Sequence, residues 1–252
     1  ASPSSRLRKY LTPMRQISLD IETHLDAQIS DFEGPGWKPI IDAARQMHVG
    51  LLNRFYLYGE AGTGKSHVLT AICESYLDMQ RSAIKVSLLD LLDAPIEAIS
   101  SLENYDLVAL DDIETISGVI HWQRAIFHLI NSSGEDGGQL IFSSRVAPSE
   151  LKFELPDLQS RLSQAVSLKV PDGSNIADRE ALIKAVLKRR GLIFDTQIID
   201  YLLHHGPYKS AALLKTIEQL DALLHGDRRK LANSTRRQIY ALIDEHNKFT
   251  AK

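Results

Sequence analysis

Eight consecutive residues have the types and the spacing that bind phosphate groups. They match the pattern GxxxxGK[ST] at every fixed position and read Gly59, Glu60, Ala61, Gly62, Thr63, Gly64, Lys65 and Ser66. Glycines allow backbone conformations in which successive amide hydrogens point inward at phosphate oxygens, aided by the positive end of a following helix. The lysine would reach the β- and γ-phosphates, and the serine hydroxyl would coordinate Mg2+. The motif predicts binding of a nucleoside di- or triphosphate; a glycine-rich turn without function is the alternative.

Polar groups end two apolar runs further along the chain. The first run, residues 107–110, is followed by Asp111, which would hold Mg2+, usually through water, and by Asp112, placed where a general base could orient the attacking water. The second run, residues 139–144, ends in small hydroxyl groups, and Ser144 could hydrogen-bond the γ-phosphate or that water. A helix cap or a strand-ending turn remains the alternative reading in each case.

Strand and helix patterns alternate around these motifs. Apolar or β-branched runs predict strands at residues 53–58, 84–88, 105–110, 139–143 and 165–170. Between them, helical spacing covers residues 37–49, 65–79, 122–131 and 157–163, while residues 91–102 are mixed and broken by Pro95. Such alternation is typical of an α/β fold, here with a parallel five-stranded sheet that brings the motif-bearing strand ends together.

The pattern changes after a turn at residues 171–175. Four helices are predicted from there, at residues 176–190, 195–204, 210–225 and 234–246, separated by glycine-containing breaks. We therefore expect three parts: a flexible N-terminal tail at 1–30, a nucleotide-binding α/β domain at 31–172 and a helical lid domain at 173–252.

Composition restricts the class of protein further. The formal net charge of −3 over 252 residues argues against nucleic-acid binding over the whole surface. Because Cys73 is the one cysteine, a disulfide framework is impossible, which fits a reducing cytosol. No apolar run of about 18 residues predicts a membrane span. Met14 could be an internal start.

Several stretches resemble the AAA+ ATPase module of the bacterial initiator DnaA, and most closely the Hda family of DnaA-homologous regulators. The resemblance covers roughly residues 16–248. Asp31 and Phe32, with Gly34, resemble the box that helps to enclose the adenine, and residues 62–67, ending in His67, resemble the family's phosphate loop. Residues 110–114, 122–131 and 155–162 carry the rest of the likeness. The resemblance implies an AAA+ fold with a helical lid that binds ADP or ATP with Mg2+.

The same resemblance makes Arg161 an arginine finger, which in AAA+ assemblies acts in trans on the nucleotide of a neighbour. A guanidinium is always charged, and its planar fork fits phosphate oxygens. A surface arginine in an ion pair is the alternative.

Two positions depart from the family pattern. Ala211 stands where the family has a sensor arginine in the third lid helix; Lys209 is close by but lacks the bidentate fork. Arg145 replaces the usual aspartate after the sensor serine. The first departure leaves nucleotide sensing and intrinsic hydrolysis open, and the second has no predicted effect.

A short peptide near the amino end resembles the segment with which Hda-family proteins bind the DNA sliding clamp, the polymerase beta subunit. It reads Gln16, Ile17, Ser18, Leu19, Asp20 and Ile21. The glutamine amide would form hydrogen bonds, while Leu19 and Ile21 would fill an apolar groove. Asp20 replaces a proline of the best-matching peptides, which lowers the expected affinity. An edge strand or helix lead-in is the alternative.

Two function hypotheses follow from these features. In the first, the protein promotes hydrolysis of DnaA-bound ATP together with the DNA-loaded clamp, which represses re-initiation of chromosome replication; its own hydrolysis is then slow. In the second, it is a self-acting AAA+ ATPase of helicase-loader or transposition-helper type. A small-metabolite kinase is a distant third. We expect no sequence-specific DNA-binding domain, because the lid helices occupy the rest of the chain, and homo-oligomers remain open.

Overall fold

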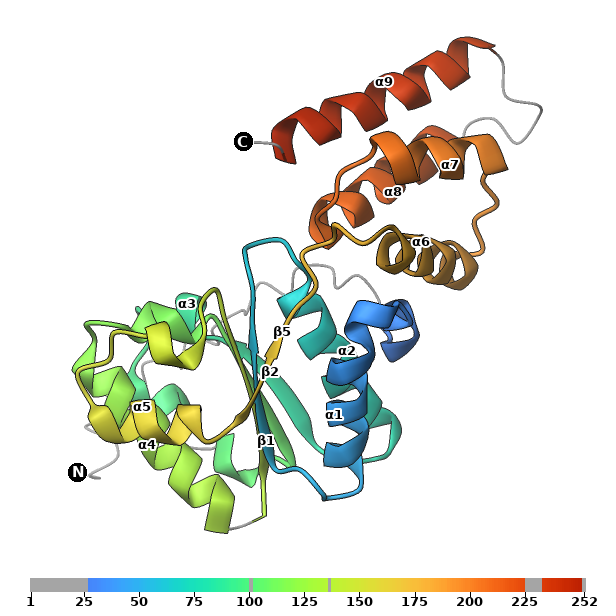
Figure 1. The fold of residues 1–252 in the computed structure, drawn as a ribbon. Helices are drawn as coiled ribbons and strands as arrows, with labels where there is room; N and C mark the ends of the chain where they lie inside the picture. The colour runs from blue at the N-terminus through green and yellow to red at the C-terminus, as the bar shows by residue number, and fades with distance from the viewer. Residues whose placement is uncertain (1–26, 100–101, 136, 225–232, 251–252) are drawn as a thin grey trace, which may run out of the picture.

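A computed structural model describes residues 27–99, 102–135, 137–224 and 233–250 (Figure 1). The clamp-binding-like peptide at residues 16–21 and Met14 lie outside these described residues. In the part of the chain that the structure covers, no helix combines the length and the hydropathy needed to cross a membrane.

Five strands form one parallel sheet in the order β2-β3-β4-β1-β5. They are β1 (Arg54–Tyr58), β2 (Ala83–Ser87), β3 (Leu107–Asp111), β4 (Gln139–Ser144) and β5 (Val166–Lys169). The carboxyl ends of parallel strands meet at one edge of a sheet, so the residues after β1, β3 and β4 are neighbours there. This topology confirms the predicted α/β fold with a five-stranded parallel sheet.

Helices cover both faces of the sheet (Figure 1). One side carries α1 (Lys38–His48) and α2 (Lys65–Asp78), and the other carries α3 (Leu88–Leu91), α4 (Ile120–Glu135) and α5 (Pro156–Ser163). Along β3, Leu107 and Ala109 join the buried cluster under α1 and α2, whereas Val108 and Leu110 join the cluster under α4 and α5. Burial on both faces explains why this strand reads as an unbroken apolar run.

The mixed segment expected at residues 91–102 resolves into short elements. Helix α3 begins earlier, where the Ser87 hydroxyl accepts a 3.4 Å hydrogen bond from the Asp90 amide. After Pro95 the described residues form single 3-10 turns, at Ile96–Ile99 and Leu102–Asn104. Two further 3-10 turns, Ile29–Phe32 and Pro35–Trp37, lead into α1.

The C-terminal part is helical, as predicted. It consists of α6 (Ile176–Arg190), α7 (Thr196–His205), α8 (Ser210–Leu224) and α9 (Asn233–Thr250), which share a third apolar cluster. Side chains cap two of these helices: Asn175 Oδ1 accepts from the Ala177 amide, and Asp195 Oδ1 accepts from the Gln197 amide. Such caps satisfy amide hydrogens that have no partner within the helix.

Helix α6 packs directly against the segment before α1. The Gly36 amide donates a 2.8 Å hydrogen bond to Asp178 Oδ1. A Cβ atom added at Gly34 would lie 2.4 Å from Asp178 Oδ1, so only glycine permits this approach. The contact joins the helical part to the α/β part at the edge that carries the phosphate-loop motif.

Candidate nucleotide-binding site

The loop between β1 and α2 has the backbone geometry that its sequence predicts. Gly62 has φ of 78° and Gly64 has φ of 103°, in the left-handed region that favours glycine. Gly64 is the N-cap of α2, so the amide hydrogens of the first helical turn face the loop with no carbonyl partner inside the helix. A loop and helix end of this kind bind anions through backbone amides and the helix dipole.

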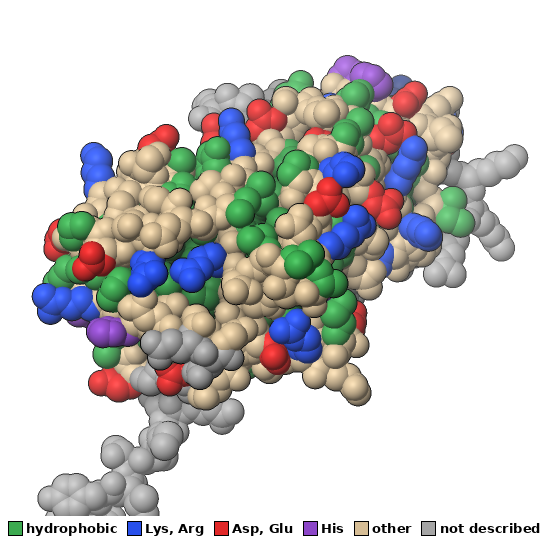
Figure 2. Space-filling model, turned by 60° about the horizontal axis from the view of Figure 1, so that its bottom comes forward, with side chains coloured by type: hydrophobic (Ala, Val, Ile, Leu, Met, Phe, Trp, Pro, Cys, Tyr) green, Lys and Arg blue, Asp and Glu red, His purple; other side chains and the backbone are tan. Residues whose placement is uncertain are grey.

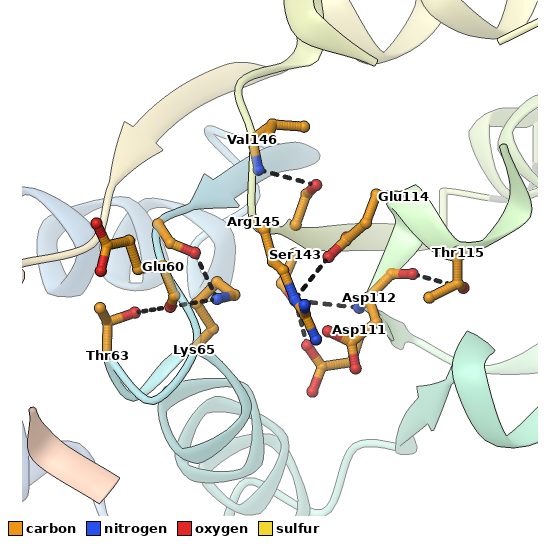
Figure 3. Close-up of polar contacts among 12 residues, drawn as sticks. Glu60, Thr63, Lys65, Asp111, Asp112, Glu114, Thr115, Ser143, Arg145 and Val146 are labelled. Atoms are coloured by element: carbon orange, nitrogen blue, oxygen red, sulfur yellow. Dashed lines mark hydrogen bonds and ion pairs between the residues drawn. The ribbon is translucent and has the colours of Figure 1, made fainter. Parts of the chain in front are cut away.

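Lys65 lies buried beneath the loop (Figure 3). Its ammonium donates to the Gly59 carbonyl at 2.6 Å and to the Glu60 carbonyl at 2.8 Å. Burial lowers the pKa of Lys65, while the negative charges of Asp111 and Glu114 act in the opposite direction. The ammonium thus sits between the loop and the carboxylates, where it suits a phosphate group bound beside Mg2+.

Asp111 ends β3 and is almost fully buried, and its Oδ1 accepts a short hydrogen bond from the Ser143 hydroxyl. The next residue, Asp112, adopts a left-handed conformation with φ of 58°. Burial, followed by the charges of Asp111 and Glu114, raises the pKa of Asp112 above its ordinary value. The donor set of Asp111 and Ser66 fits a Mg2+ site, and the raised pKa fits a carboxylate that accepts a proton.

The two hydroxyls at the end of β4 have different roles. Ser144 is fully buried, and its Oγ accepts a 3.2 Å hydrogen bond from the Val146 amide. Ser143 instead contacts Asp111 and also accepts from the Asp112 amide at 3.4 Å. Side chains alternate along a strand, and Ser143 shares the face of Ile141, on the side of α2. Sequence analysis missed Ser143, because β4 is buried on both faces and its sequence does not reveal which hydroxyl lies on the side of Asp111.

A charged pair that sequence analysis did not assign lies next to these carboxylates. Arg145 Nε is 3.4 Å from Glu114 Oε1. In Figure 3 the Arg145 side chain lies between Lys65 and Asp112, and its positive charge acts on the pKa of both. The carboxyl edge of the sheet therefore gathers three carboxylates and two cations from separate segments.

The first turn of α8 covers the phosphate loop. The Ala211 amide donates a 3.1 Å hydrogen bond to the Gly62 carbonyl, and Lys209 Nζ is 3.2 Å from Glu60 Oε2. Ala211 thus lies against the loop and brings no charge there. The lysine two positions earlier pairs with the loop's own glutamate.

The residues expected to enclose the base gather at the start of α2. The Phe32 ring centroid is 4.6 Å from that of Trp37 and 5.3 Å from that of His67. Asp31 is buried, and its Oδ2 is 3.3 Å from His67 Nε2 and 3.1 Å from Arg189 Nη2 of α6. These side chains adjoin the phosphate loop on the side of the helical part.

Arg161 lies elsewhere. It is exposed in the last turn of α5, and among the described residues it forms no hydrogen bond or ion pair. Burial, and then the positive charge of nearby Arg161, lower the pKa of Arg54. Since Arg54 begins β1 and the phosphate loop follows its end, Arg161 and the loop lie near opposite ends of this strand.

Comparison with known proteins agrees with this architecture. A protein of Haemophilus influenzae described as an uncharacterized protein is 29% identical over 211 residues, covering 82% of this chain and 90% of its own. DnaA from Aquifex aeolicus bound to AMPPCP is 25% identical, with a TM-score of 0.65 over 81% of this chain and 67% of that one.

Domain III of Thermotoga maritima DnaA has the same fold, with a TM-score of 0.75 and 18% identity over 89% of this chain and 98% of that one. The family model for the bacterial DnaA ATPase domain matches residues 40–169, from α1 to the end of β5. With this match and the phosphate loop between β1 and α2, the chain belongs to the bacterial DnaA ATPase-domain family, as a DnaA-like AAA+ nucleotide-binding protein.

Proposed function

We propose that the protein binds ADP or ATP with Mg2+ at this site and acts as an Hda-type regulator. With the DNA-loaded sliding clamp, it promotes hydrolysis of ATP bound to DnaA and so represses re-initiation of chromosome replication. The nucleotide that is hydrolysed belongs to the partner, and the protein's own nucleotide holds its two parts in the active arrangement.

The location of Arg161 carries this proposal. The five residues of β1 separate its surroundings from the protein's own phosphate loop, a span of about 16 Å at the usual rise per residue. The guanidinium is exposed and unpaired among the described residues, so it is free to meet a phosphate on another molecule. An arginine finger that one molecule supplies to the nucleotide of another stabilises the charge that develops during phosphoryl transfer.

Within its own site, each residue has a defined task. The loop amides and Lys65 would bind the phosphates, while Ser66 and Asp111 would hold Mg2+, which neutralises phosphate charge when bound. Asp112 would accept a hydrogen bond from a water molecule next to the terminal phosphate. Phe32 and His67 would flank the base beside the first turn of α2.

The peptide at residues 16–21 would supply the clamp contact. A docking peptide placed before the folded part binds through a few side chains while its tether leaves the AAA+ part free to reach DnaA. A pull-down on the clamp tests this step: replacing Gln16 and Leu19 with alanine should abolish capture while nucleotide binding persists.

The decisive experiment is a single-turnover assay. DnaA loaded with ATP is mixed with the clamp on DNA and with this protein, and ADP formation is followed. We expect Arg161→Ala to reduce the stimulated rate by about 10³-fold or more, as for other arginine fingers. Arg237→Ala, an exposed arginine on α9, is the matched control and should stimulate normally. Equal stimulation by the Arg161→Ala variant would exclude the finger role.

A self-acting ATPase is the second candidate. Lys65, Asp111 and Asp112 form a complete set in the protein's own site, which favours intrinsic hydrolysis. The DnaA structure with AMPPCP and single-stranded DNA is 25% identical to this chain, so single-stranded DNA is a reasonable stimulus to test. ATP turnover by this protein alone, raised by single-stranded DNA and lost in Lys65→Ala, would favour this candidate.

A further inference from the structure

Glu114 and Arg145 form an ion pair at the edge of the nucleotide site. Arg145 Nε is 3.4 Å from Glu114 Oε1, and their side chains are 62% and 20% exposed. Glu114 lies three residues after Asp111, which ends β3, and Arg145 directly follows β4, the neighbouring strand. A role of this ion pair in recognising nucleotide depends on the nucleotide binding proposed above.

The Glu114 carboxylate is poorly satisfied where it lies. Both of its oxygens are buried, and neither accepts a hydrogen bond among the described residues. A buried carboxylate that lacks hydrogen bonds loses its solvation without full compensation. The Arg145 charge compensates through electrostatic attraction alone, so the pair is held without the directional bonds that would fix it.

The Arg145 guanidinium has donors to spare. It carries five N–H groups in a planar fork, and none donates a hydrogen bond to a described residue. The side chain is mostly exposed and can reorient without disturbing the core. It is therefore an exposed cation at the site, held near Glu114 and with donors available for a better acceptor.

A bound terminal phosphate would supply that acceptor. The loop and Lys65 fix where phosphates bind, and Arg145 is close enough for its charge to act on both Lys65 and Asp112 (Figure 3). Ala211, on the α8 turn that covers the loop, offers no cation to a terminal phosphate. Arg145 is then the described arginine best placed to contact it.

We propose that Arg145 contacts the terminal phosphate of a bound nucleoside triphosphate within the same chain and leaves Glu114 to do so. The protein would then distinguish triphosphate from diphosphate at the end of β4 instead of at the lid. A diphosphate does not extend to Arg145, so the ion pair with Glu114 persists. Glu114 competes with the terminal phosphate for Arg145, which keeps the preference for triphosphate over diphosphate moderate.

Calorimetric titration with AMPPCP–Mg2+ and with ADP–Mg2+ tests the proposal. Arg145→Ala should weaken AMPPCP binding about tenfold or more, the value of charge-assisted hydrogen bonds. ADP binding should change less than about twofold. Arg145→Lys, which keeps the charge but loses the fork, should recover part of the AMPPCP affinity.

The Glu114→Gln variant provides an independent test of the proposal. Removing the competing carboxylate should tighten AMPPCP binding and leave ADP binding unchanged. In the Arg145→Ala background the same substitution should have no effect, which a double-mutant cycle measures. Lys209→Ala, which removes the cation that pairs with Glu60, should not alter the ratio of the two affinities.

The outcomes distinguish a wrong role for Arg145 from a failure of nucleotide binding itself. If Lys65→Ala abolishes binding of both nucleotides but Arg145→Ala weakens both equally or neither, the site stands and the role of Arg145 is wrong. If the unaltered protein binds neither nucleotide, the proposed function fails, and the role of Arg145 fails with it. Thermal unfolding of each variant verifies that it is folded.

Discussion

The Ala211 amide donates a 3.1 Å hydrogen bond to the Gly62 carbonyl, so α8 begins on top of the phosphate loop. The Ala211 side chain adjoins the same loop, since a Cβ atom added at Gly62 would lie 3.9 Å from Ala211 Cβ. Bringing a cation to this position should therefore alter affinity without altering the fold.

Ala211→Arg should tighten AMPPCP binding about tenfold, because a guanidinium at this position can donate to a phosphate. Ala222→Arg, an exposed position further along α8, is the matched control and should leave affinity unchanged. Calorimetry compares the two variants. Equal affinities for both would mean that residue 211 does not face the phosphates.

Gly64→Ala should disrupt the loop. A Cβ atom there requires the left-handed backbone at φ of 103° and would lie 3.3 Å from the Trp37 ring. We expect a loss of about 1–2 kcal/mol of stability together with loss of ADP binding.

Gly50→Ala is the control for this substitution, because Gly50 also has positive φ but has open space around it. It should cost about the same stability and leave ADP binding intact. Chemical denaturation and calorimetry measure the two effects separately. ADP binding that survives in Gly64→Ala would contradict the assignment of the loop.

The Asp31–Arg189 pair should matter for stability far more than a surface pair. Asp31 has no exposed side-chain area and Arg189 only 12%, so Arg189→Met leaves a buried carboxylate without its guanidinium. The expected loss is on the order of 3 kcal/mol in denaturant unfolding. Arg190→Met breaks the more exposed pair with Glu218 and should cost less than about 1 kcal/mol. Similar losses in the two variants would refute this difference.

His48 should make stability depend on pH. Burial, and then the charge of Arg81, lower the pKa of His48 below its ordinary value of 6.5 in the folded protein. The unfolded chain therefore binds the proton more readily, so stability is full above pH 6.5 and is lost as the pH falls through the folded pKa.

His48→Gln should remove this contribution. Between about pH 7.5 and pH 5.5 the unaltered protein should lose more unfolding free energy than the variant does. Urea unfolding at several pH values gives the difference between the two proteins. Parallel pH profiles would show that His48 titrates alike in both states.

Local motifs were predictable from the sequence, and contacts between distant segments were not. The phosphate loop has fixed spacing within one turn, so Gly59 to Ser66 could be recognised directly. Strand β4 is buried on both faces, which hides the alternation that turns Ser143, and not Ser144, toward Asp111. The Glu114–Arg145 pair depends on the order of β3 and β4 in the sheet, which no local pattern encodes.

The separation of Arg161 from the protein's own phosphate loop gives the molecule two unlike ends. A contact that brings the arginine of one molecule to the nucleotide of the next joins different surfaces, so repeating it head to tail builds a row of molecules. Such a contact leaves a free arginine at one end and an open nucleotide site at the other. A single copy joined to a row of related ATPases would therefore act on one neighbour only, and its direction in the row would decide which one.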